Sequence, residues 1–149
     1  MKNKIKARFI FEILGRPPEH IKETLEKVVD TLGKQEGVKI LEKKVHEPKL
    51  LEKENVENMF TTFSEVEVEV DNLNLVFLIV LNMLPSNVEI TEPSELKTTN
   101  FDLTAILSDL AIKIHKYDEI AKALTLQRNQ LINKINQMTD KSDKEKNSE

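Results

Sequence analysis

Apolar residues recur at intervals of seven along the last third of the chain, where neither proline nor glycine occurs. Leu103, Leu110, Tyr117, Leu124, Leu131 and Met138 form one series, and Leu107, Ile114, Ala121 and Ile135 form the other, which Arg128 interrupts. Two interleaved series with this spacing predict one long helix with a coiled-coil seam. A helix over residues 103–138 is about 54 Å long at roughly 1.5 Å per residue. The rest of the chain is too small to cover the whole of this helix, so we expect only its first half to pack on its own domain.

We therefore expect the second half of this helix to pack against a second copy of the chain. Thr99 or Asn100 is a suitable N-cap, and Asp102 follows Thr99 at the spacing of a capping box. The expected oligomer interface comprises Leu110, Ile114, Tyr117, Ala121, Leu124, Arg128, Leu131, Ile135 and Met138. A break near residues 116–119, with a helical hairpin folding back on its own domain, is the alternative.

Arg128 bears on how two such helices would be oriented. A parallel homodimer brings two guanidinium groups together in the seam, which is costly, so we favour an antiparallel dimer. Residues 139–149 contain no apolar residue, and we expect them to form a disordered polar tail. These boundaries give an N-terminal domain over 1–98, an oligomerisation helix over 99–138 and a tail over 139–149.

The first two-thirds of the chain contain all three glycines and all five prolines. Strict alternation predicts strands at residues 5–13 and 60–70, with shorter strands at 38–45 and 87–91. Helical periodicity predicts one helix that follows the Pro17-Pro18 pair, with an apolar face from Ile21 to Leu32, and that ends at Gly33. A second helix is predicted over 73–84, capped by Asp71 or Asn72. The order βαββαβ indicates an α+β, ferredoxin-like sandwich: a four-stranded antiparallel sheet with two helices on one face. The helix at 73–84 is apolar on nearly every side, so we expect burial on both of its faces.

Charges on the two long strands suggest how these strands pair. With Lys4 opposite Glu69, Lys6 opposite Glu67 and Arg8 opposite Glu65, three opposite charges align at once, and Ile10 falls opposite Phe63. We predict this antiparallel register.

Composition excludes several classes of protein. The 149 residues carry a net charge of −4 and contain neither cysteine nor tryptophan, so disulfides, thiolate metal sites and a catalytic cysteine are ruled out. The chain has only three arginines and more acidic than basic residues. Duplex nucleic acid is therefore a poor partner, because its binding depends on neutralising phosphates. No apolar run is long enough to span a bilayer and no signal-type segment opens the chain, so we expect a cytoplasmic protein without a membrane partner.

Candidate binding residues gather where the first strand leads into the first helix. Arg16 and His20 flank that junction, and His46 ends the next strand at what should be the same edge of the sheet. One interpretation is a site at this edge where Arg16, His20 and His46 hold a small anion, or where His20, His46 and Glu47 hold a metal. The simpler interpretation is that these are ordinary surface residues, and we predict no metal and no cofactor.

No arrangement of residues points to catalysis, because the chain lacks a phosphate loop, a metalloprotease pair and a nucleophile elbow. Our leading hypothesis is a non-enzymatic oligomeric adaptor or assembly protein that self-associates through its C-terminal helix. One alternative is a regulatory domain of the ACT type that binds a small anionic ligand or a metal near the first strand–helix turn. Another is a factor associated with a ribonucleoprotein.

Overall fold

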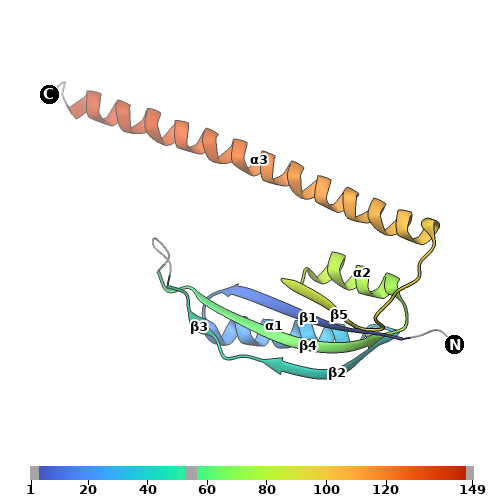
Figure 1. The fold of residues 1–149 in the computed structure, drawn as a ribbon. Coiled ribbons are helices and arrows are strands. Elements are labelled where there is room, and N and C mark those ends of the chain that lie inside the picture. Colours follow the sequence, from blue (N-terminus) through green and yellow to red (C-terminus); the bar gives the residue numbers. More distant parts are fainter. Residues whose placement is uncertain (1–3, 53–56, 147–149) are drawn as a thin grey trace. The chain divides into compact units, whose positions relative to one another are not determined.

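The computed structural model describes residues 4–52 and 57–146, which form an α+β fold with an antiparallel sheet and a long C-terminal helix. The elements are β1 (Ile5–Gly15), α1 (Pro18–Gly33), β2 (Val38–Val45), β3 (Lys49–Leu50), β4 (Phe60–Val70), α2 (Leu73–Met83), β5 (Asn87–Glu92) and α3 (Asn100–Lys146) (Figure 1). The chain divides into two compact units. Unit 1 ends at Ile106 and contains the sheet, α1, α2 and the first turns of α3, and unit 2 begins at Leu107 and contains the rest of α3.

Among the residues that the structure describes, the sheet has five strands, one more than predicted. β2, β4, β1 and β5 lie side by side in this order, and β3 pairs with β4 outside that path. β2 pairs with β4 from Val70 to Ser64, and β3 continues along β4 at Thr61 and Phe60. Pro48 lies between β2 and β3 and has no N–H to donate, which interrupts the ladder there. Strand β3 lies between the strands predicted at residues 38–45 and 60–70, where we predicted none.

The predicted register between β1 and β4 is wrong by two residues. Lys6 lies opposite Glu69, Arg8 opposite Glu67 and Ile10 opposite Glu65. Both registers place the same side chains on the same face, because side chains alternate with a period of two. The observed one pairs all eleven residues of β1 with all eleven of β4, from Ile5↔Val70 to Gly15↔Phe60. Complete backbone pairing therefore prevails over the alignment of three charge pairs.

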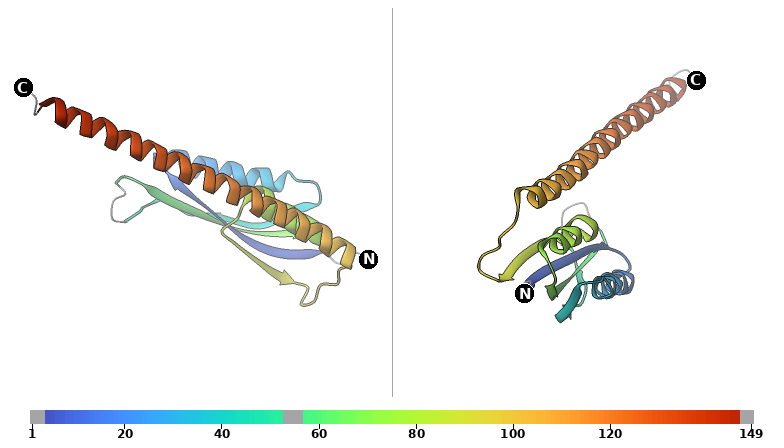
Figure 2. Two further views of the ribbon diagram at one scale, coloured as in Figure 1. Left: turned by 90° about the horizontal axis from the view of Figure 1, so that it is seen from above. Right: turned by 90° about the vertical axis from the view of Figure 1, so that its right-hand side faces the viewer.

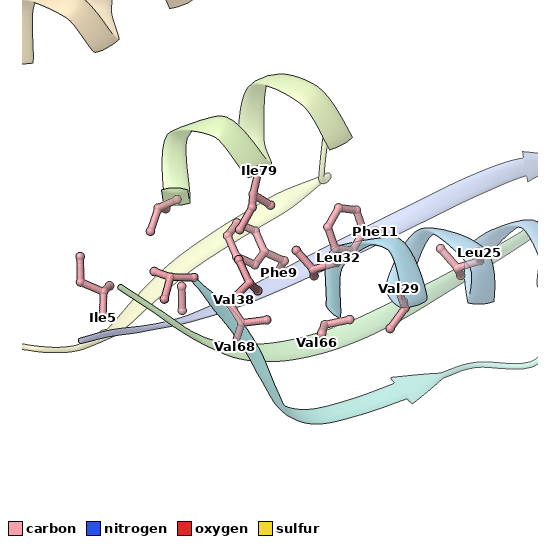
Figure 3. Close-up of a cluster of buried hydrophobic side chains, with 13 residues drawn as sticks. Ile5, Phe9, Phe11, Leu25, Val29, Leu32, Val38, Val66, Val68 and Ile79 are labelled. Atoms are coloured by element: carbon pink, nitrogen blue, oxygen red, sulfur yellow. The ribbon is translucent and has the colours of Figure 1, made fainter. Parts of the chain in front are cut away.

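One hydrophobic cluster joins both helices to the same face of the sheet. Phe9 and Phe11 of β1, Leu25 and Leu32 of α1, and Ile79 of α2 are all nearly inaccessible to solvent and belong to this cluster (Figure 3). The alternating apolar residues of β1 and β4 face these helices, and the intervening charged residues face away. The amphipathic strand pattern thus produces a sheet with one covered and one open face.

The helix α2 begins and ends with recognisable caps. The Asn72 side chain accepts a hydrogen bond from the Leu75 backbone N–H at 3.0 Å, and Leu84 ends the helix in the left-handed conformation with φ of 52°. Leu81 is buried although it lies about 200° around the helix from Ile79. Burial on two sides is what the apolar sequence of this helix indicated, but Leu78 remains 46% exposed.

The helix α3 is continuous over its described length (Figure 2). The Asp102 backbone N–H donates to the Thr99 hydroxyl oxygen at 3.1 Å, as the capping box predicted. No break occurs at residues 116–119, so the helical hairpin is not the structure of this segment. The polar stretch that we expected to be disordered is helical from Thr139 to Lys146, and residues 147–149 lie outside the described residues.

Candidate functional site

Arg16 and His20 are exposed residues at the junction of β1 and α1. Pro17 occupies the N-cap position of α1 and offers no side-chain cap. The backbone carbonyl of His20 accepts a hydrogen bond from the Thr24 hydroxyl at 2.8 Å within the same helix. The structure places both residues where the sequence predicted, at the start of α1.

His46 is held by four contacts just after β2. Its ring stacks on Phe63 with centroids 4.0 Å apart, and its Nε2 lies 3.0 Å from Glu65 Oε2. Its backbone N–H donates to the Phe63 carbonyl at 2.9 Å, and its carbonyl accepts from the Thr62 hydroxyl at 2.6 Å. The imidazole is therefore committed to β4, a role that the sequence analysis missed. Continuing the pairing of β2 and β4 beyond Val45↔Ser64 would have brought it next to Phe63.

The contact between His46 and Glu65 changes the pKa of the Glu65 carboxyl group. The hydrogen bond from His46 is the main cause that lowers the pKa of Glu65 below its usual 4.5, and the charges of His46, Lys44 and Arg8 lower it further. Glu65 was expected to form a charge ladder with Arg8, but its direct partner is His46. Arg8 instead lies 3.9 Å from Glu67 and 3.7 Å from Glu89.

An ion pair between Lys22 of α1 and Glu47 joins the start of the helix to the end of β2. These two segments thus lie at the same edge of the sheet, as expected. His20, two positions before Lys22, points about 200° away around the helix, on the side opposite the ion pair. Within the described residues, no three His, Asp or Glu side chains could hold a metal ion together. The hypothetical metal site of His20, His46 and Glu47 is therefore not formed.

The seam of α3 is the most extended apolar surface that the sequence singled out. Leu110 is half-buried, and the other eight predicted interface residues are exposed, with Leu124 at 59% and Ile135 at 61%. Lys113 Nζ lies 6.0 Å from the centroid of the Tyr117 ring, and Arg128 Nη2 donates to the Asn129 side-chain oxygen at 3.2 Å. The described residues of unit 2, 107–146, all belong to this single helix. A lone helix cannot bury a stripe on its own surface.

The protein is thus an α+β protein in which a helix-covered sheet precedes a long, heptad-patterned helix. Residues 6–147 match the MJ0538 family, and the chain belongs to this family. No curated protein and no solved structure matches the chain. In the part of the chain that the structure describes, no helix combines the length and the apolar character needed to cross a membrane.

Proposed function

We propose that this protein is a non-enzymatic, cytoplasmic adaptor or assembly protein that forms homodimers through α3. The observation that carries the proposal is the exposed seven-residue repeat of a helix 47 residues long, to which all the described residues of unit 2 belong. An isolated helix gains little stability in water unless its apolar face is packed. A second copy supplies a matching face, because the same seam is present on both chains.

We also propose that unit 1 is a variant of the ferredoxin-like sandwich. The neighbour order β2-β4-β1-β5 and the packing of α1 and α2 in one cluster support this assignment. In this interpretation β3 is an addition to the edge next to β2. Unit 1 would then serve as the part of the adaptor that the α3 dimer presents in two copies.

Light scattering on the full chain tests the self-association. The double variant Leu124→Glu/Leu131→Glu places two carboxylates in the seam, and we expect it to be monomeric at concentrations where the natural chain is a dimer. The matched control, Gln130→Glu/Gln137→Glu, adds the same charges outside the seam and should remain a dimer. A natural chain that is monomeric across the accessible concentration range would refute the proposal, and a control that also dissociates would show that charge alone drives the effect.

A further inference from the structure

The seam of α3 contains one residue that does not suit an apolar interface. Arg128 occupies a position between Ala121 and Ile135 in the seven-residue series, and the helix exposes it. A polar residue at a single seam position can specify the register and the oligomeric state of a coiled coil. The question is where its guanidinium group goes when two copies associate.

We propose that Arg128 sets an antiparallel orientation of the α3 dimer by packing against Tyr117 of the second copy. In this register Arg128 lies opposite Tyr117, Ala121 lies opposite Leu124, and Leu110 lies opposite Ile135. Each arginine then meets an aromatic ring, and the two guanidinium groups stay apart. This inference rests on the proposed self-association and adds its geometry.

The Tyr117 ring is suited to receive a cation. It is the only aromatic residue in the seam, and it already has the ammonium group of Lys113 at 6.0 Å from its centroid within the same helix. Arginine is the cation that most often packs on aromatic faces in proteins. Arg128 of a second copy would meet this ring in a partly desolvated seam, where such an interaction is stronger than at an exposed site.

The length of α3 agrees with the same register. When Arg128 is placed opposite Tyr117, Asn100 at the start of one helix falls opposite residue 145 near the end of the other. The two helices, each spanning Asn100–Lys146, then overlap over almost their whole length. Shifting the register by one heptad places Arg128 opposite Leu110, which leaves residues 139–146 unpaired, or opposite Leu124, which leaves residues 100–105 unpaired.

Charge distribution along α3 also favours antiparallel packing. Residues 100–112 contain Asp102 and Asp109 and no basic residue, whereas residues 120–138 contain Lys122, Arg128 and Lys134 and no acidic residue. A parallel dimer aligns each segment with its own copy, so like charges meet. The antiparallel register aligns 120–138 with 107–125, where acidic and basic residues are balanced.

Charged residues beside the seam have the opposite effect and favour parallel packing. A parallel dimer would bring Lys113 near Asp118 of the other copy, and the antiparallel register brings Lys113 near Lys134. These are surface pairs, whose contribution is small and screened by salt. Two arginines facing each other within the seam lose hydration without gaining a partner, which is the larger effect.

Single cysteines can report the orientation directly, because the natural chain has none. We would prepare full-length Leu110→Cys and Ile135→Cys variants and oxidise them separately and as an equimolar mixture. In the proposed register residue 110 of one chain lies opposite residue 135 of the other. The two residues 110 of a dimer are then about 37 Å apart along its axis, as are the two residues 135, which is far beyond the reach of a disulfide. We therefore expect a covalent dimer in the mixture and none in either variant alone.

The outcomes separate the geometry from the proposed function. Covalent dimers in each single variant, with none formed between the two, would establish parallel packing and overturn the inference while leaving self-association intact. A dimer by light scattering that forms no cross-link in any sample would overturn the register. A monomer by light scattering would overturn the proposed function itself.

The role of Arg128 needs its own variant. Arg128→Leu removes the polar seam residue, and we expect the single-cysteine variants that carry it to begin cross-linking with themselves, since parallel packing is no longer opposed. Tyr117→Phe retains the aromatic face and serves as the matched control, in which the antiparallel pattern should persist. If Arg128→Leu keeps the cross-linking pattern of the natural sequence, Arg128 does not set the orientation.

Discussion

Two buried hydroxyl groups in the core of unit 1 should have opposite effects on its stability: removing one should raise the free energy of unfolding and removing the other should lower it. Ser64 and Thr62 lie two residues apart on the covered face of β4, and both are almost completely buried. The Thr62 hydroxyl donates to the His46 carbonyl at 2.6 Å, whereas the Ser64 hydroxyl has no hydrogen-bond partner within the described residues. A buried polar group without a partner costs about 1–3 kcal/mol. Ser64→Ala should therefore stabilise unit 1 by about 1 kcal/mol, because the lost atom leaves only a small void.

Thr62→Val is the matched test, because it removes a hydroxyl of similar burial while preserving shape. It leaves the His46 carbonyl without this donor, so we expect a loss of about 1 kcal/mol. Native-state hydrogen exchange of the β1 and β4 amides reports the stability of the sheet in unit 1 independently of unit 2. A change of about 1 kcal/mol in its free energy of unfolding alters the exchange rates about fivefold. Faster exchange in Ser64→Ala would refute the reasoning, since it would show that the hydroxyl stabilises the core.

Three further substitutions test the backbone and the acid response of unit 1. Gly37→Ala should destabilise it by at least about 1 kcal/mol in urea denaturation, because φ there is +79° and the new methyl would lie 2.8 Å from a Leu75 methyl group. Leu84→Gly should stabilise it by about 0.5 kcal/mol, since relief of the left-handed conformation exceeds the entropy that glycine adds to the unfolded chain; a lower urea midpoint would contradict this. Because His46 keeps the pKa of Glu65 below 4.5, ionised Glu65 stabilises the fold above that pH and loses this effect as pH falls through the lowered value. Glu65→Gln should flatten the acid side of the stability profile measured by denaturation at successive pH values, and an unchanged acid slope would show that the pair is unimportant.

Most elements of unit 1 could be predicted because each carries a local pattern. The alternation in β4 and the asparagine before α2 define those elements without reference to the rest of the chain. The register between β1 and β4 could not be predicted from charges, because Arg8 also reaches Glu89 of β5 and is not reserved for β4. Strand β3 was missed because two residues carry no detectable periodicity.

For the candidate sites too, features of a single element could be predicted from sequence and contacts between elements could not. The helix α3 and the apolar stripe along it could be predicted from sequence, because a heptad pattern is intrinsic to one helix. That this stripe is an oligomer interface stays a prediction. The environment of His46 could not be predicted in this way, because it depends on how β2 pairs with β4. A bulge in β2 between Ile40 and Glu42 shifts the register of that pairing. Proximity of a histidine to a carboxylate across strands is a tertiary property, which residue spacing along the chain does not encode.

The separation into two units has a thermodynamic consequence for α3. Unit 1 has its own buried cluster, so its stability should not depend on chain concentration. Residues 107–146 have no core of their own, and helices without packed apolar faces are marginal in water. If a second copy supplies that packing, the helicity of unit 2 depends on concentration through mass action, while the protection of β1 and β4 amides does not. Circular dichroism at 222 nm measured over a dilution series, together with hydrogen exchange on the same samples, would reveal this difference. Helicity that stays constant far below the dissociation midpoint would show that α3 derives its stability from something other than its copy.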